Sequence, residues 1–286
     1  MMELKFTKMQ GAGNDYVYVD CTQQELEDPG RISEYVSRRH FSVGADGLIT
    51  IGKSAVADFK MRIFNADASE GKMCGNGIRC VAKYVYDRGM TDKTTMTIET
   101  LSGIKTIDVK VEEGKVVSAK VDMGAPVFKC ADIPMISDHF MFVDQGLAMD
   151  ITQNEVYNGT AISMGNPHFV IFVKDVDNYP VTELGPRIEK HNLFPEGVNV
   201  EFVEVVDKKT VKFRVWERGS GETMACGTGA CAVTVAANML GNAGKQGEPL
   251  TVICKGGTLT ITYGNDGHVY MEGPAEESFS GTVEVK

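Results

Sequence analysis

The sequence predicts an α+β fold of two homologous, pseudo-symmetric domains, each a strand-rich, barrel-like shell around a central helix. Two observations predict it. Most segments have the apolar alternation or β-branched content of strands, and helical patterns are few. The chain also repeats itself, because a shift of 152 positions places Cys74 on Cys226, Gly75 on Gly227 and Gly77 on Gly229.

The expected elements follow from local patterns. Strands are expected in the first half at 16–20, 48–51, 59–64, 104–111 and 116–123, and in the second half at 133–143, 161–173, 200–206 and 211–217. Hairpin turns are expected at Glu113-Gly114 and at Asn265-Asp266-Gly267. Helices are expected at about 31–40, 77–88, 182–192 and 227–240. The last of these is apolar nearly all round and stops at Gly241, which indicates a helix buried inside its own domain.

The repeat extends beyond the cysteines. The same shift matches Lys60 with Lys212, Arg62 with Arg214, Glu70 with Glu222 and Gly13-Asn14 with Gly165-Asn166. Each half also finishes alike, at Met123-Gly124-Ala125-Pro126 and at Met271-Glu272-Gly273-Pro274. We therefore expect two related domains that face each other across a cleft.

Composition excludes several classes of function. The chain has 286 residues, of which 43% are hydrophobic and 24% charged, as in globular proteins with real cores. A formal net charge of −10 argues against a nucleic-acid partner or an anionic membrane surface. No apolar stretch is long enough to span a bilayer. Seven cysteines, an odd number, favour free thiols and a cytoplasmic location.

Cys74 and Cys226 are the candidate catalytic residues. Each is expected at a helix N-terminus, where backbone N–H groups lower a thiol pKa and can hold an anion. Two thiols on opposite faces of one carbon could invert it, one removing a proton and the other returning it. The N–H groups of Gly75, Asn76, Gly227 and Thr228 could hold the carboxylate beside that carbon.

Other uses of the cysteines are less consistent with the sequence. A zinc site of Cys74, Cys80, Cys226 and Cys231 fails, because cysteines five or six apart on a helix point roughly 120–140° apart. A redox pair remains possible, but there is no Cys-x-x-Cys. The remaining cysteines are expected in the core: Cys21, Cys80, Cys130, Cys231 and Cys254.

A set of motifs, in order along nearly the whole chain, resembles the diaminopimelate epimerase family. They are Gly13-Asn14-Asp15, Asn65-Ala66-Asp67, Met73 to Cys80, Gly165 to His168, Gly197-Val198-Asn199, Glu217-Arg218-Gly219 and Ala225 to Gly229. Two departures are Ala68, where the family commonly has glycine, and Gln10, where it often has histidine. The resemblance implies cofactor-independent interconversion of LL- and meso-diaminopimelate in lysine and peptidoglycan precursor synthesis, without metal or pyridoxal phosphate.

The same resemblance implies a homodimer and a C-terminal strand, about Gly281 to Val285, that returns to the first domain. The domains would then be 1–124 with 275–286, and 125–274. Cys74 and Cys226 would be the base and acid. The substrate-binding residues would be Asn14, Asn65, Asn166, Asn199, Glu217 and Arg218. His168 and Glu217 are candidates for tuning thiol pKa values, although His168 could equally be a core residue; Asp46 is expected to be a turn residue.

Two alternatives stay open. A proline or hydroxyproline racemase would also use paired cysteines, but a small cyclic substrate has no distal amino-acid group for Glu217-Arg218 to hold. A non-catalytic amino-acid-binding protein would have no need for a thiol at both helix starts.

Overall fold

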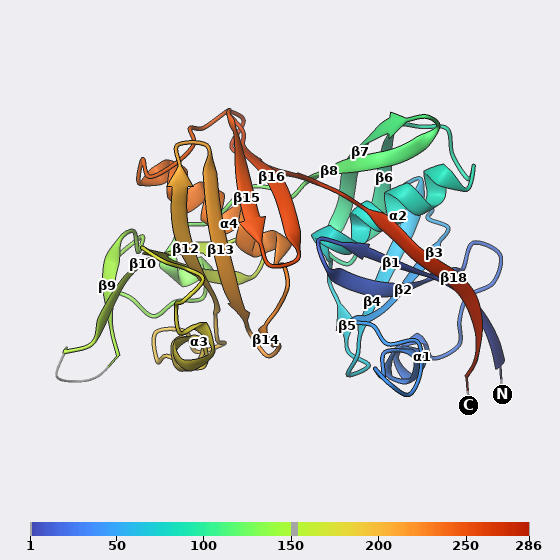
Figure 1. The fold of residues 1–286 in the computed structure, drawn as a ribbon, viewed down its shortest axis with the longest axis horizontal. Coiled ribbons are helices and arrows are strands. Elements are labelled where there is room, and N and C mark those ends of the chain that lie inside the picture. The colour runs from blue at the N-terminus through green and yellow to red at the C-terminus, as the bar shows by residue number, and fades with distance from the viewer. Residues whose placement is uncertain (1, 150–153, 286) are drawn as a thin grey trace. The chain divides into compact units, whose positions relative to one another are not determined.

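The structure, a computed structural model, describes residues 2–149 and 154–285. The chain divides into two compact units (Figure 1). Unit 1 contains Met1–Asp122 and Glu272–Lys286, and unit 2 contains Met123–Met271. No helix of the described residues is long and apolar enough to cross a membrane.

The described residues of unit 1 form mostly strands, with two helices. Its elements are β1 (Met2–Gly11), β2 (Asn14–Asp20), α1 (Pro29–Val36), β3 (Gly47–Gly52), β4 (Phe59–Asn65), β5 (Glu70–Gly71), α2 (Gly75–Asp87), β6 (Thr95–Thr100), β7 (Gly103–Glu112), β8 (Lys115–Asp122) and β18 (Glu276–Val285). Unit 2 repeats most of this order. Its elements are the 3-10 helix η1 (Cys130–Asp132), β9 (Gln145–Ala148), β10 (Val156–Ser163), β11 (Pro167–Val173), α3 (Val181–Glu189), β12 (Asn199–Asp207), β13 (Thr210–Glu217), β14 (Gly221–Glu222), α4 (Gly227–Met239), β15 (Pro249–Cys254), β16 (Gly257–Tyr263) and, ending in unit 1, β17 (Val269–Gly273).

The two units share strand register as well as element order. In unit 1, β2 and β3 are parallel with Tyr16 opposite Gly47, and in unit 2, β11 and β12 are parallel with His168 opposite Asn199. Both pairs fit the shift of 152 positions that aligns the cysteines. The predicted α+β fold of two homologous, pseudo-symmetric halves is therefore confirmed.

Each unit has a long buried helix. On α4, Ala232, Val233, Val235 and Ala236 are fully buried, so its small apolar residues fill the centre of unit 2. The helix ends at Met239, close to the prediction, and Gly241 follows with a φ of 68°. On α2, ten of its thirteen residues are buried, so this helix has the same central role in unit 1.

The end of the chain completes the first unit. β18 pairs with β1 in antiparallel register from Met2 opposite Val285 to Gln10 opposite Glu276 (Figure 1). The predicted return of the C-terminal strand is confirmed, and the strand begins at Glu276, five residues earlier than expected. Because β1 also pairs with β2, β18 covers what would otherwise be an open sheet edge.

Three sequence predictions of elements differ from the structure. The expected strand at 133–143 is wrong: Ile133, Met135 and Phe142 are buried, but the segment is irregular after η1. The expected strand at 161–173 is two strands, β10 and β11, because the chain reverses at 164–166. The first helix ends at Val36, well before the predicted end at His40.

Candidate active site

Cys74 and Cys226 are the N-cap residues of α2 and α4. Both have extended backbones, with φ and ψ of −135° and 117° for Cys74 and −111° and 113° for Cys226. The sulfur accepts a hydrogen bond from the amide three residues on, at 3.3 Å from Gly77 N and 3.4 Å from Gly229 N. The thiol thus takes the position that a Ser or Asp side chain usually has at a helix start.

The second glycine of each Cys-Gly-x-Gly motif has a steric reason. A Cβ at position 229 would lie 3.3 Å from the Cys226 sulfur and 2.7 Å from Glu201 Oε1. At position 77 a Cβ would lie 3.5 Å from the Cys74 Cβ. Glycine therefore leaves room for Glu201 and the Cys226 sulfur at the start of α4, and for the Ile49 side chain at the start of α2.

In unit 1, Cys74 is the first member of a chain of polar contacts. Its thiol donates to Asn14 Oδ1 at 3.2 Å, and Asn14 Nδ2 donates to Asp46 Oδ2 at 2.8 Å. Asp46 Oδ1 in turn accepts from Arg39 Nη2 at 3.1 Å. Asp46 is therefore more than the turn residue that the sequence suggested, because it fixes the amide of Asn14.

In unit 2, Cys226 lies beside acidic side chains. Its sulfur is 3.4 Å from Thr228 Oγ1, and the Glu217 carboxyl lies within hydrogen-bonding reach of the thiol. The Thr223 hydroxyl donates a short hydrogen bond to Glu217 Oε1. Burial raises the pKa of the Glu217 carboxyl above its ordinary value.

The expectation that the helix N-termini depress both thiol pKa values is wrong. Burial raises the pKa of Cys74, although the N–H of Gly77 and the Tyr16 hydroxyl oppose the shift. Burial raises the pKa of Cys226 well above its ordinary value, and the charges of Glu217 and Glu201 raise it further. Desolvation of a thiolate thus outweighs the helix terminus at both positions.

His168 is fully buried between two oxygen atoms. Its Nδ1 lies 2.7 Å from Glu201 Oε1, and its Nε2 lies 3.0 Å from Asn166 Oδ1. Glu201 is also fully buried, and its second oxygen has no hydrogen-bond partner in the described structure. These two contacts fix the orientation of the imidazole ring inside unit 2.

The predicted amide residues divide into two groups. In unit 2, Asn199 Nδ2 donates to Pro167 O at 2.8 Å, and Asn199 Oδ1 accepts from Arg218 N at 2.9 Å, so this side chain fixes the backbone at Arg218. The Arg218 guanidinium donates to Glu196 O at 2.9 Å. In unit 1, Asn65 Nδ2 donates to Ser69 Oγ at 3.0 Å, and buried Asn76 accepts from Arg79 Nη1 at 3.0 Å.

The other cysteines lie in the core as expected. Their exposed fractions run from zero to 9% for Cys21, Cys80, Cys130, Cys231 and Cys254. Within residues 2–149 and 154–285, no three His, Cys, Asp or Glu side chains converge as a metal site would require.

Sequence reasoning missed Glu201, Tyr16 and Thr223. Glu201 has a recognisable signal, since it is the single acid between Val198 and Val203 and takes the position of Ile49 in the repeat. A charge inside a buried strand needs a partner, and that partner is His168. Tyr16 falls on His168 in the repeat, but a tyrosine in a strand has no such signal.

Comparison with solved structures defines the class of fold. The chain superposes with a TM-score of 0.73 on a PhzF-family phenazine biosynthesis protein from Bacillus anthracis, at 21% identity and full coverage of both chains. It superposes with a TM-score of 0.69 on a hydroxyproline epimerase from Agrobacterium vitis, at 14% identity over 99% of this chain and 91% of the other. The molecule therefore has the two-domain fold of these proteins.

Closer relatives define the family. The model of the diaminopimelate epimerase family matches residues 6–129 and 160–277. A diaminopimelate epimerase from Methanococcus maripaludis is 52% identical over 99% of this chain and all of its own length. One from Acetivibrio thermocellus is 50% identical over 99% of both chains. The chain belongs to the diaminopimelate epimerase family.

Proposed function

We propose that this protein is an isomerase that interconverts LL- and meso-diaminopimelate, in the synthesis of lysine and of peptidoglycan precursors. Its relatives at about half identity over nearly full length carry that name. The observation that carries the proposal is the duplicated helix start, where Cys74 and Cys226 are both N-cap residues whose sulfurs accept from the third amide.

The proposed chemistry is a proton exchange at one α-carbon. One cysteine, as thiolate, removes the α-proton, and the thiol of the other returns a proton to the opposite face of the same carbon. One C–H bond breaks, one forms, and the two sulfurs exchange protonation states. Since burial raises both thiol pKa values, a nearby base has to generate the thiolate, and Glu217 lies within reach of Cys226.

Groups in both units are proposed to hold the substrate. Backbone N–H groups of Gly75, Asn76, Gly227 and Thr228 would bind the carboxylate next to the reacting carbon as negative charge develops there. The second amino-acid group would be held by Asn14, Asn65, Asn166, Asn199, Glu217 and Arg218. His168, with Glu217, would set the charge around the thiols.

We further propose that the protein needs neither pyridoxal phosphate nor metal, works as a homodimer and is cytoplasmic. The proposed domains are 1–124 with 275–286, and 125–274. The helix termini, which stabilise the developing negative charge, would replace the electron sink that a cofactor provides.

The decisive experiment is an assay of purified protein with LL-diaminopimelate, following meso-diaminopimelate by chiral chromatography. We expect conversion that persists after exhaustive EDTA and hydroxylamine treatment. L-Proline and trans-4-hydroxy-L-proline are the comparison substrates. Turnover of either of these in preference to diaminopimelate would replace the proposal with the racemase alternative, and binding of diaminopimelate without conversion would favour a binding protein.

A further inference from the structure

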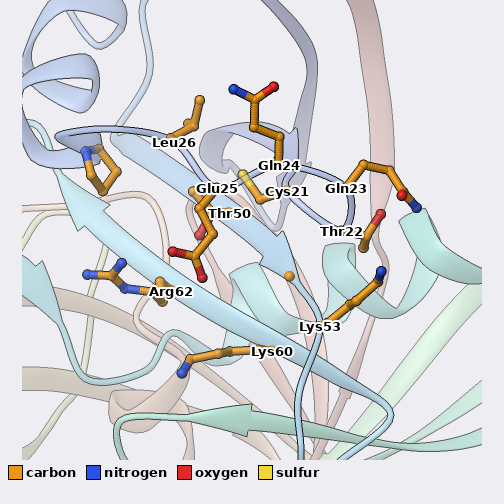
Figure 2. Close-up of a pocket in the computed structure, with 12 residues that line it drawn as sticks. Cys21, Thr22, Gln23, Gln24, Glu25, Leu26, Thr50, Lys53, Lys60 and Arg62 are labelled. Carbon is orange, nitrogen blue, oxygen red and sulfur yellow. The ribbon is translucent and has the colours of Figure 1, made fainter.

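A cavity lies in unit 1, on the side of the loop between β2 and α1. It has a volume of about 370 Å³, and the loop between β2 and α1 forms one wall while β3 and β4 form the other. Figure 2 shows Lys60 and Arg62 projecting from the strand side, with Glu25 extending towards them from the loop. A cavity of this size accommodates a molecule as large as an amino acid.

The charge lining this cavity differs from that of the whole chain. Lys53, Lys60 and Arg62 line it together with a single acid, Glu25, in a protein whose formal net charge is −10. Lys53 forms no ion pair or hydrogen bond within the described residues. An excess of cations at a concave surface attracts a small anion.

The internal repeat supplies a built-in comparison for Arg62. Its counterpart in unit 2, Arg214, donates through Nη1 to three loop carbonyls, those of Val176, Asp177 and Tyr179, at 2.9–3.1 Å. The side chain of Arg214 is only 16% exposed, because the loop between β11 and α3 closes over it. In unit 2 the loop's own oxygens thus satisfy the guanidinium.

In unit 1 the corresponding loop stands away from the arginine. Arg62 pairs with Glu70 through Nε and Nη2, as Arg214 pairs with Glu222, but among the described residues Nη1 has no loop carbonyl. The side chain is 41% exposed. Lys60 pairs with Glu99, at 3.2 Å, whereas its counterpart Lys212 pairs with Asp177 of the closing loop. Arg62 therefore faces a cavity in unit 1, and within the described residues its Nη1 lacks the loop carbonyls that Arg214 Nη1 contacts in unit 2.

We propose that this cavity binds a small aliphatic carboxylate, whose oxygens take the place of the loop carbonyls of unit 2. The carboxylate would bind Arg62, Lys60 and Lys53. The apolar surface of Leu26 and the Cys21 side chain would contact a short carbon chain. Both a dicarboxylate and an amino acid have this chemistry, and Glu25 would favour the amino acid by pairing with its ammonium group.

The test is a titration of the isotope-labelled full-length protein with glutarate, and separately with L-norvaline, followed by amide NMR. We expect saturable shifts of the Thr22 backbone and of the Gln23 and Gln24 side-chain amides, at ligand concentrations up to about 20 mM. Preference for norvaline would identify the amino-acid class, and preference for glutarate the dicarboxylate class. Neutral glutaramide is the ligand control and should leave these signals unchanged.

Two variants test separately the charge of the cavity and the space inside it. Lys53→Met removes a cation that has no partner to lose, and should weaken binding roughly tenfold. Gly52→Leu should block the cavity, since Gly52 lies two residues after Thr50 on the same face of β3, and an added Cβ meets nothing within 4 Å. Lys110→Met, on β7 outside the cavity, is the matched control and should bind like the parent protein.

The proposal is overturned if no saturable shift occurs at the loop, if glutaramide binds equally well, or if Lys53→Met and Lys110→Met behave alike. Shifts confined to Asn14, Asn166 and their neighbours would also overturn it, because the ligand would then bind only at the candidate active site. None of these readouts uses epimerase turnover, so they are independent of the proposed function.

Discussion

Glu217 illustrates how burial and charge act together on a single group. Its carboxyl lies within hydrogen-bonding reach of Cys226, and the charge of Glu217 raises the thiol pKa. We predict that Glu217→Gln lowers epimerase activity roughly 10²- to 10³-fold, because the local base is lost. The same change should lower the Cys226 pKa, so the rate of iodoacetamide alkylation should rise at lower pH than in the parent protein.

The same variant changes the pH dependence of stability. The folded-state pKa of Glu217 lies above its ordinary value of 4.5. The stability that the protonated carboxyl contributes is therefore fully present below pH 4.5 and is lost as the pH rises through the folded-state pKa. Glu217→Gln should therefore raise Tm at pH 7 and change it little at pH 4. A variant with normal alkylation and the parent Tm at both pH values would show that Glu217 does not act on Cys226.

Glu201 is predicted to position His168. Glu201→Gln removes the carboxylate that pairs with Nδ1 and should reduce kcat about tenfold or more. In ¹⁵N NMR of labelled histidines, the Nδ1 signal of His168 should move in the variant, because the group that contacts this nitrogen has changed. His168→Gln identifies the signal.

Glu204→Gln is the matched control for Glu201→Gln. Glu204 lies on the same strand, and its Oε2 accepts from Val176 N at 2.9 Å, an acceptor function that glutamine keeps. Its kcat and histidine spectrum should match those of the parent protein. Equal losses in the two variants would reduce Glu201 to a general structural role.

For single residues, the sequence identifies the catalytic candidates but does not predict how their surroundings shift their pKa values. Cys74 and Cys226 stand out because their surroundings are duplicated, and the structure places both at helix starts. Their raised pKa values could not be predicted, because burial depends on side chains remote in sequence. Asp46 shows the same limit, since only the fold brings it to Asn14.

At the level of elements, the first turns of α2 and α4 are equivalent in backbone but differ in what lies behind them. A Cβ at Gly77 would meet Ile49 Cδ1 at 2.6 Å, which is the flexible end of a side chain. A Cβ at Gly229 would meet Glu201 Oε1 at 2.7 Å, and that oxygen is held by His168.

We therefore predict that Gly229→Ala destabilises the protein by about 1–3 kcal/mol. Gly77→Ala should cost less than about 1 kcal/mol, because alanine's helix propensity offsets the movement of Ile49. Urea unfolding of both variants measures the difference. Equal losses would show that the Glu201 carboxylate moves aside without cost.

The sequence predicts helices and strands best where an apolar pattern is bounded by a recognisable start or stop signal. The four helices were expected because each combines apolar periodicity with a recognisable start or stop, as at Gly241 for α4. The strand predicted at 133–143 is wrong because Ile133, Met135 and Phe142 are buried in an irregular segment that forms no named strand. Alternation predicts a buried face but cannot establish that a neighbouring strand is present.

At the level of the whole molecule, a mechanism with two bases has an isotopic signature. Product formed in D₂O should carry deuterium at the inverted carbon, because the returning proton comes from the second thiol. Early in the reaction the remaining substrate should carry much less. Equal early labelling of substrate and product, measured by mass spectrometry, would indicate a single exchanging base.

The overall architecture is the part that the sequence predicts most fully. A shift of 152 positions, found from residue identities, also relates the helices α1 and α3 and the parallel strand pairs of the two units. The two halves share identical residues at turns and at Cys-Gly-x-Gly because few residue types can adopt the backbone conformations required there. The cavity of unit 1 could not be predicted, because it results from the path of one loop.

The pairing of β18 with β1 also has a consequence for synthesis on the ribosome. Unit 2 is one uninterrupted stretch, Met123–Met271, and has all its residues before the chain is finished. Unit 1 includes Glu272–Lys286 and lacks β18 until these residues, which follow unit 2 in the chain, have been made. Unit 1 thus begins before unit 2 but is completed after it, and until then its nascent β1 edge is open to pairing with a neighbouring chain.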